Sequence, residues 1–266
     1  MRSAAAPSNS PTLVLREAKG SIARITLNRP EGLNALSMAL LDQLESVLGA
    51  LAEDGSVRVV VMAANGRAFC TGHDLKEMLE RRTPEFLHAL FDKCCRIMAA
   101  LARLPQPVIA RVHGTATAAG CQLVAACDLA VASSEARFAT SGINYGLFCA
   151  TPAVPISRSL GRKHALEMLF TGEFIDADTA LRWGLVNRVA APEALDATVD
   201  ALCNTLLAKP AAVLASGKRF FYRQLELGME EAYREAAAVL ASHMLADDGL
   251  EGVSAFLAKR KPDWAR

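Results

Sequence analysis

Hydrophobic and polar positions follow two alternating patterns along the first 190 residues, one typical of strands and the other of helices. Short apolar runs bounded by turn residues predict strands at residues 13–17, 22–27, 58–63, 108–112, 129–132 and 186–189. The first two runs flank Lys19-Gly20-Ser21 and predict a hairpin. Apolar residues at helical spacing predict helices at residues 38–52, 83–103 and 176–181, the first capped by Ser37. Strands and helices therefore alternate, which indicates the α/β class.

The pattern changes after Pro192, where only helical periodicity remains. It predicts four further helices, at residues 193–207, 211–227, 230–246 and 250–259. We therefore expect three parts: a flexible tail at residues 1–11, an α/β core at 12–191 and a C-terminal helical region at 192–266. No low-complexity linker separates the last two parts. The C-terminal helices are expected to pack on the core or on a neighbouring subunit.

Composition and charge narrow the classes of protein that fit. The chain has 266 residues, of which 52% are hydrophobic and 21% charged, as expected for a globular protein with a sizeable core. A formal net charge of +1 gives no reason to expect a nucleic-acid or membrane partner. No apolar run reaches the roughly 18 residues of a membrane span. Any anionic ligand must therefore be held by local groups.

The cysteines and the N-terminus indicate a reducing compartment. Seven cysteines form no C-x-x-C pair, which predicts free, mostly buried thiols and neither a disulfide framework nor a metal site. Residues 1–12 lack the apolar core of a secretory signal. We expect a cytoplasmic protein, or a mitochondrial matrix protein if the source is a eukaryote, and a weak organelle-targeting segment stays open as an alternative.

Two segments, residues 59–78 and 108–129, share one design. In each, an apolar strand ends, a loop of small residues follows, and a helix begins. Small residues allow a ligand to approach backbone N–H groups, and the start of a helix adds unsatisfied donors and the positive end of its dipole. Such loops are suited to an oxygen atom that carries negative charge.

Six fragments in this order resemble the crotonase, or enoyl-CoA hydratase/isomerase, superfamily over residues 13–264. The fragments are NRPEGLNAL (28–36), FCTGHDLKEM (69–78), HGTATAAGCQLVAACDLAVAS (113–133), FATSGINYGLF (138–148), LEMLFTGEFIDADTALRWGLVNRV (166–189) and FLAKRKPDW (256–264). The resemblance implies a crotonase-type spiral of repeated β-β-α units and a C-terminal helical region that forms homotrimers or homohexamers. It also implies acyl-CoA as the ligand and a place in fatty acid metabolism.

The resemblance further implies a specific site. The backbone N–H groups of His73 and Ala119 would form an oxyanion hole for the thioester carbonyl. We expect the side chain of His73 to face solvent, and side-chain chemistry stays open as the alternative. Coenzyme A would enter as part of the substrate, with no permanently bound cofactor and no metal. The residues implied in coenzyme A binding are Asp74, Leu75, Lys76, Phe256 and Lys259, of which the last two would close on the nucleotide end, in the same or a neighbouring subunit.

The chain departs from the hydratase pattern at both catalytic glutamate positions, which hold Gln122 and Gly142. An amide has no exchangeable acid proton near neutral pH, and glycine has no side chain. Loss of acid–base catalysis lowers a rate by roughly 10²- to 10⁴-fold for each group. We found no replacement base among the other residues of the acyl loop: Thr140, Ser141, Asn144, Tyr145 and Cys149.

These substitutions lead to one prediction and two alternatives. The prediction is an enoyl-CoA hydratase/isomerase-type protein, a lyase or isomerase by family, that stabilises a thioester enolate but hydrates crotonyl-CoA slowly or not at all. The first alternative is a non-catalytic protein that binds acyl-CoA in regulation. The second is a decarboxylase similar to methylmalonyl-CoA decarboxylase, which shares a G-H-D-hydrophobic loop like residues 72–75. Departure of CO₂ itself generates the enolate, so a decarboxylase depends less on a base.

Overall fold

Strands of two sheets alternate along the chain and wind it into a spiral. The computed structural model describes residues 11–264, so the predicted tail lies almost entirely outside them. The larger sheet has the order β1 (Val14–Lys19), β2 (Ile22–Leu27), β3 (Val59–Ala64), β5 (Val108–Val112), β7 (Leu129–Ser133) and β10 (Arg188–Ala190). The smaller sheet has the order β4 (Ala68–Cys70), β6 (Thr115–Thr117), β8 (Arg137–Ala139) and β9 (Ile175–Asp176).

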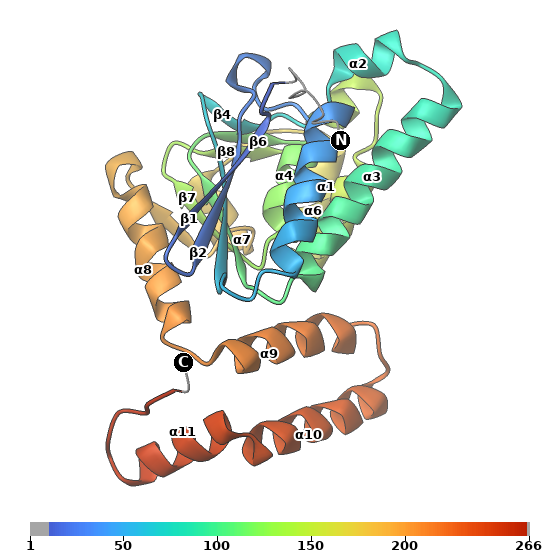
Figure 1. Ribbon diagram of the computed structural model, residues 1–266. Coiled ribbons are helices and arrows are strands. Elements are labelled where there is room, and N and C mark those ends of the chain that lie inside the picture. The colour runs from blue at the N-terminus through green and yellow to red at the C-terminus, as the bar shows by residue number, and fades with distance from the viewer. Residues whose placement is uncertain (1–10, 265–266) are drawn as a thin grey trace, which may run out of the picture.

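After the opening hairpin of β1 and β2, the strand pairs β3–β4, β5–β6 and β7–β8 each contribute one strand to each sheet. The strands β3, β5, β7 and β10 pair in parallel, and so do β4, β6 and β8. A helix or helices follow each strand pair, so the chain repeats a β-β-α unit (Figure 1). Among the described strands, only the opening hairpin of β1 and β2 and the short β8–β9 pair are antiparallel. The predicted crotonase-type spiral is therefore confirmed.

The central strands β3, β5 and β7 of the larger sheet are covered on both faces, which explains why they are almost continuously apolar. Along β3, Val60 and Met62 point into the main core, whereas Val59 and Val61 point into a second core. This alternation follows from the two-residue period of a strand. The second core is closed by α8 (Leu195–Leu207), which packs across the sheet (Figure 1).

The helices on the main-core side carry the functional loops. Their bounds are α1 (Met38–Ala52), α2 (Leu75–Glu80), α3 (Pro84–Arg103), α4 (Ala119–Ala126), α5 (Ala150–Ser159), α6 (Arg162–Thr171) and α7 (Ala177–Trp183). The predicted N-cap Ser37 is present, and Thr83 and Asp176 cap their helices in the same way, since each accepts a hydrogen bond from a backbone N–H of the following turn. Short 3₁₀ turns lie at Pro30–Gly32, Ser141–Tyr145 and Pro192–Ala194.

The helices α5 and α6 and the second sheet were absent from the sequence-based prediction. Helix α5 contains Pro152 in its first turn and Pro155 in its interior, which weaken the helical signal. The strands of the second sheet are only two or three residues long, too short for a period-two pattern to be recognised. These helices and the second sheet are stabilised by packing within the spiral rather than by the local propensity of their sequences.

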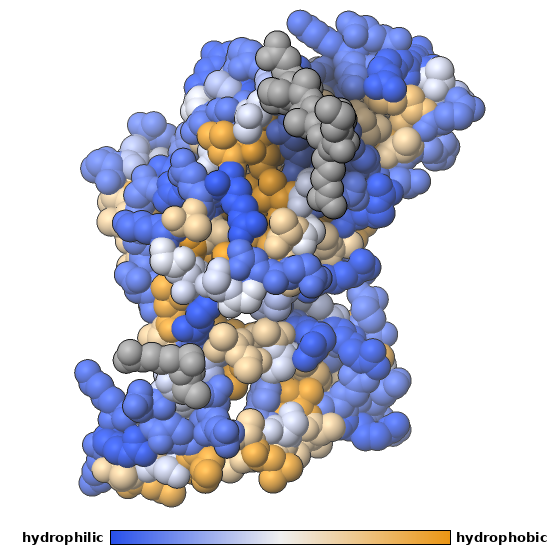
Figure 2. All heavy atoms as spheres, viewed as in Figure 1, coloured by the Kyte–Doolittle hydropathy of each residue, from blue (hydrophilic) through white to orange (hydrophobic). Residues whose placement is uncertain are grey.

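The last three helices form an arm beside the body of the protein (Figure 1). They are α9 (Ala211–Gln224), α10 (Met229–Leu245) and α11 (Asp247–Leu257). No residue of α9 or α10 is fully buried, and large apolar side chains are exposed on α10 and α11. Figure 2 shows hydrophobic residues along the lower edge of the arm. Within residues 11–264, no helix is long and apolar enough to cross a lipid bilayer.

Candidate active site

The two small-residue loops meet at the start of α4. Gly72 has a φ of 92°, a conformation that favours glycine, and a Cβ there would lie 2.9 Å from the Cβ of Ala118 and 3.3 Å from the backbone N of Ala119. A Cβ at Gly120 would lie 2.0 Å from the carbonyl oxygen of Cys70. The missing side chains therefore let the end of β4 and the start of α4 approach each other.

A short bridge to Leu36 sets the direction of the His73 backbone. The N–H of Leu36 donates to the carbonyl of Gly72 at 2.7 Å, and the N–H of Asp74 donates to the carbonyl of Leu36 at 3.2 Å. Because successive peptide groups of an extended segment point in opposite directions, the N–H of His73 points away from Leu36. Within the described residues it donates to no backbone carbonyl.

The second N–H group belongs to Ala119, the first residue of α4. The first N–H groups of a helix have no acceptor within it, and within residues 11–264 this one donates to no carbonyl elsewhere. The preceding Ala118 has φ 48° and ψ −119°, a strained combination for a residue with a Cβ. Its N–H donates to Ala139 at 2.9 Å, and its carbonyl accepts from Gln122 at 3.0 Å. Such strain costs roughly 1–3 kcal/mol and is typical of functional sites.

Both loops line one cavity of about 390 Å³. His73 and Ala119 lie in its wall together with apolar side chains from α2 and α3: Leu75, Met78 and Phe91. The opposite wall comes from the segment 141–152, which adds hydroxyl groups, a thiol and further apolar side chains. The lining contains no carboxylate, no lysine and no arginine. This composition suits an uncharged, largely apolar group next to two free N–H donors.

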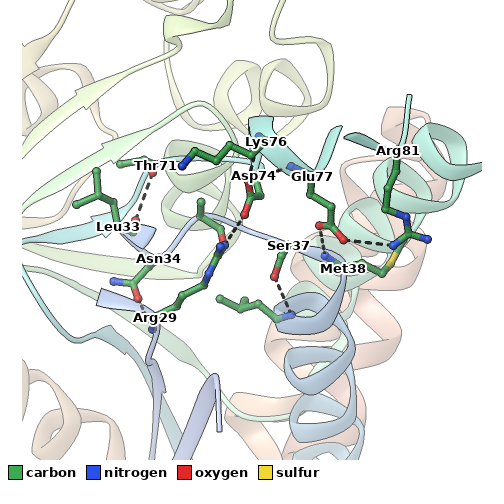
Figure 3. A network of polar contacts seen from close by, with 12 residues as sticks. Arg29, Leu33, Asn34, Ser37, Met38, Thr71, Asp74, Lys76, Glu77 and Arg81 are labelled. Carbon is green, nitrogen blue, oxygen red and sulfur yellow. Dashed lines mark hydrogen bonds and ion pairs between the residues drawn. The ribbon is translucent and has the colours of Figure 1, made fainter. Parts of the chain in front are cut away.

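An ion pair behind the cavity holds the His73 loop in place (Figure 3). The guanidinium of Arg29 lies 2.7 Å from the carboxylate of Asp74 and also donates to the carbonyl of Ala35 at 3.1 Å. The other oxygen of Asp74 caps α2 by accepting from the N–H groups of Lys76 and Glu77. Partial burial raises the pKa of Asp74, but the hydrogen bond from Arg29 and the cap outweigh this and lower it.

Two further contacts connect this loop to its neighbours. The carboxylate of Glu77 accepts from the N–H of Met38 at 2.9 Å, which joins the start of α1 to α2 (Figure 3). The fully buried amide of Asn34 accepts from the N–H of Arg29 at 2.9 Å and donates to the carbonyls of Asn65 and Ala68 at 2.8 and 2.9 Å. Sequence reasoning did not identify Arg29 and Asn34 as positioning residues, although both stand in the NRPEGLNAL motif.

The two vacated glutamate positions have different surroundings. Gln122 is 2% exposed and does not line the cavity, and its Oε1 atom has no hydrogen-bond partner among residues 11–264. Gly142 lines the cavity, but a Cβ there would lie 2.6 Å from the carbonyl oxygen of Leu147 and 2.8 Å from the Sγ atom of Cys149. The loop after β8 therefore fills the space that a glutamate side chain at position 142 needs.

The side chain of His73 does not face solvent, and that expectation was wrong. The ring is partly buried and packs edge-on against Phe91, with 5.2 Å between ring centroids. Burial lowers its pKa to about 4, so the imidazole is neutral at physiological pH. Its Nε2 atom is enclosed and has no hydrogen-bond partner. The sequence shows only a histidine in a glycine-rich loop, which gives no signal for this burial.

The residues expected to contact coenzyme A lie in three different places. Leu75 lines the cavity, whereas the side chain of Asp74 is engaged behind it and Lys76 is exposed on the first turn of α2. Phe256 and Lys259 lie at the end of the arm and do not line the cavity of their own chain (Figure 1). Within residues 11–264, no group of three or more metal-ligating side chains comes together.

Comparison with known proteins defines the class. The profile of the enoyl-CoA hydratase/isomerase family matches residues 17–266, and the chain belongs to this family. A crystal structure of an enoyl-CoA hydratase from Mycobacterium smegmatis is 56% identical, has a TM-score of 0.94, and matches over 96% of this chain and 99% of that one.

More particular relatives carry the name enoyl-CoA hydratase domain-containing protein 3. The combination of A-A-G-C-Q-L with F-A-T-S-G-I-N-Y-G-L-F-C predicts a relationship to this branch. The prediction is confirmed. The mitochondrial protein of this name from Xenopus laevis is 43% identical over 96% of this chain and 87% of its own length. The crystal structure of the human protein is 40% identical, with a TM-score of 0.91 over 95% of this chain and all of that one.

Proposed function

We propose that this protein binds acyl-CoA thioesters and stabilises the enolate of the acyl group between the backbone N–H groups of His73 and Ala119. The main observation behind the proposal is the bridge between His73, which lies in the wall of an apolar cavity, and Leu36. This bridge turns the N–H group of His73 away from Leu36. A fixed donor at a developing oxyanion contributes about 3–4 kcal/mol to transition-state stabilisation. Two such donors without competing acceptors support enolate chemistry.

The coenzyme A portion would extend from the cavity over α2. Leu75 in the wall and the exposed Lys76 next to it support this course, since lysine is a mobile point charge suited to phosphates. Phe256 and Lys259 would reach the nucleotide from a neighbouring subunit of a homotrimer or homohexamer. Coenzyme A would be present only as part of the substrate. The bacterial and mitochondrial relatives support a cytoplasmic location in a bacterium and a matrix location in a eukaryote.

Ordinary enoyl-CoA hydration is not the reaction that this cavity supports. Adding water across the double bond requires a base that activates the water, and the cavity wall contains no carboxylate. The expected rate is lower by roughly 10²- to 10⁴-fold for each missing group. The sequence-based prediction of slow or absent hydration therefore stands as a proposal.

The test combines binding and turnover on the same preparation. Acyl-CoAs of different chain lengths should stabilise the protein against unfolding, by about 2.7 kcal/mol at a concentration a hundredfold above the dissociation constant. Crotonyl-CoA should be bound but not consumed at the rate of an ordinary hydratase. Absence of stabilisation by every acyl-CoA would contradict the binding proposal, and rapid loss of the 2-enoyl absorbance would contradict the proposed absence of hydration.

Mass spectrometry of the same mixtures separates the remaining alternatives. Stabilisation without any chemical change in the ligand, including exchange at the α-carbon, would favour a regulatory binding protein. Loss of CO₂ from malonyl- or methylmalonyl-CoA would favour a decarboxylase. Both reactions use the same pair of N–H donors, so neither result changes the location of the site.

A further inference from the structure

His73 carries an imidazole that the role of its backbone N–H group does not explain. The residue lines the cavity, and Phe91 of α3 supports the ring at 5.2 Å between centroids. Nε2 is enclosed without a partner, and Nδ1 forms no hydrogen bond with any residue in the described part of the chain. A buried polar atom without a partner costs about 1–3 kcal/mol and requires an explanation. Because Nε2 is enclosed, Nδ1 is the nitrogen left to meet a ligand.

A neutral imidazole is also easier to bury in this cavity than an ionised carboxylate. Burying an ionised carboxylate among apolar side chains costs far more than burying a neutral ring, even one with an unpaired nitrogen. Burial lowers the pKa of His73 to about 4, close to the reference value of about 4.3 for a glutamate side chain. The ring is therefore unprotonated at neutral pH and has a nitrogen lone pair that can accept a proton.

We infer that the imidazole of His73 is the group that exchanges a proton with the α-carbon of the bound acyl thioester. This inference rests on the proposed function, because the thioester oxygen must lie at the N–H of the same residue. It gives His73 two separate roles, one for its backbone and one for its side chain. It also supplies the base that sequence reasoning sought in the acyl loop.

The proposed step balances without a cofactor. The α-carbon loses a proton to Nδ1, and the electron pair of the broken C–H bond forms the carbon–carbon double bond of the enolate. The thioester oxygen takes the negative charge between the N–H groups of His73 and Ala119. The imidazolium then exchanges its proton with solvent and returns a proton to the α-carbon. In heavy water the net result is deuterium at the α-carbon.

No charged group in the cavity competes with this role. Burial is the only cause that lowers the pKa of His73. On its own loop, Asp74 is paired with Arg29 behind the cavity. From the opposite wall, Cys149 contributes a thiol whose pKa burial raises, although a hydrogen bond from Gly142 lowers it in part, and Ser141 contributes a hydroxyl. The imidazole is therefore the one side chain in the cavity wall that can accept a proton at neutral pH.

The experiment measures deuterium incorporation into butyryl-CoA in heavy water by mass spectrometry. The natural protein should exchange the α-protons well above the background rate. The variants His73→Ala and His73→Gln keep the backbone N–H, so the oxyanion hole stays intact while the base is lost. We expect both to exchange at least about 100-fold more slowly. Added imidazole should restore part of the rate in the alanine variant, whose cavity has room for it.

The controls separate failure of the inference from failure of the proposed function. His113→Gln removes a histidine outside the cavity wall and should exchange at the natural rate. Thermal stabilisation by butyryl-CoA should persist in both His73 variants. Exchange at the natural rate in His73→Ala, or stabilisation of the natural protein without any exchange, would overturn the role of the imidazole and leave acyl-CoA binding intact. Absence of stabilisation by any acyl-CoA would overturn the proposed function itself.

Discussion

At the scale of single residues, the burial of His73 makes the stability of the fold depend on pH. Its pKa falls from 6.5 to about 4 on folding, so between these values the unfolded chain binds more protons than the native one. The free energy of unfolding therefore decreases as the pH falls from about 6.5 to 4, by at most roughly 3 kcal/mol from this residue. In His73→Gln, which cannot titrate, this part of the acid sensitivity should disappear.

Urea unfolding at several pH values between 7 and 4 provides the measurement. The natural protein and His73→Gln should differ in the slope of unfolding free energy against pH. His88→Gln, which changes an exposed histidine on α3, should keep the natural slope. Equal slopes for the natural protein and the His73 variant would mean that the ring is not buried in solution.

A second prediction concerns Arg29, which supports the His73 loop without contacting the cavity. Its partner Asp74 is 13% exposed, so removing the guanidinium in Arg29→Met leaves a largely buried carboxylate without its cation. We expect a loss of about 2 kcal/mol in unfolding free energy. The rate of α-proton exchange should also fall, with less effect on acyl-CoA affinity, because the His73 N–H loses its fixed direction.

The neighbouring ion pair between Arg81 and Glu77 offers a matched control. It is longer, at 3.4 Å, and the side chain of Arg81 is well exposed. Arg81→Met should cost at most about 1 kcal/mol and leave exchange unchanged. If the Arg29 and Arg81 variants behaved alike, the ion pair behind the cavity would have no positioning role.

At the scale of elements, the tight conformation of the loop after β8 bears on whether glutamates can be placed at positions 122 and 142. At position 142, a side chain would meet the carbonyl of Leu147 and the sulfur of Cys149. At position 122, a glutamate would be buried without a partner, which raises its pKa and costs stability. We predict that Gln122→Glu with Gly142→Glu is destabilised and gains no hydratase activity. Crotonyl-CoA turnover and thermal unfolding of the double variant check this, and a hydratase rate would show that the loop can open.

The same loop shows what the sequence could predict and what it could not. Strands such as β3 and caps such as Ser37 follow from local patterns, whereas the meeting of the two loops was implied by the resemblance to the crotonase superfamily. That Cys149 fills the space beside Gly142, or that Phe91 packs against His73, depends on tertiary packing between separate elements. No periodicity records such contacts, so the sequence could not predict which side chains fill the space beside the two loops.

At the scale of the whole molecule, the arm has too little contact with its own body to bury its apolar residues. Leu245 is 89% exposed and Phe256 is 80% exposed, and several neighbours on α10 and α11 are exposed as well. Such a surface is typical of an interface between subunits. It supports the proposed homotrimer or homohexamer. Light scattering should show one of these masses, and Leu245→Glu with Phe256→Glu should shift the protein towards monomers while the body stays folded.

A buried cluster on α9 fixes the arm to the body and provides the final prediction. Lys218 is 7% exposed, lies 2.6 Å from a carboxylate oxygen of Asp128, and donates to the carbonyls of Leu101 and Gln106. One turn further along the helix, Tyr222 donates to the other oxygen of Asp128 at 2.8 Å. These contacts connect the arm to the turn between α4 and β7. This turn follows the C-terminal end of α4, and Ala119 lies at the N-terminal end of the same helix.

Removing the ammonium group in Lys218→Met should leave the buried carboxylate of Asp128 without its cation and cost about 3–5 kcal/mol. The arm should then detach before the body unfolds, which limited proteolysis would detect as early cleavage near the start of α9.

Arg223→Met on the same helix removes an exposed ion pair with Glu235 and should change neither stability nor cleavage by much. The double variant Lys218→Met with Asp128→Asn should recover part of the loss, because it no longer buries an unpaired charge. Equal proteolysis of Lys218→Met and Arg223→Met would mean that apolar contacts, rather than this cluster, hold the arm in place.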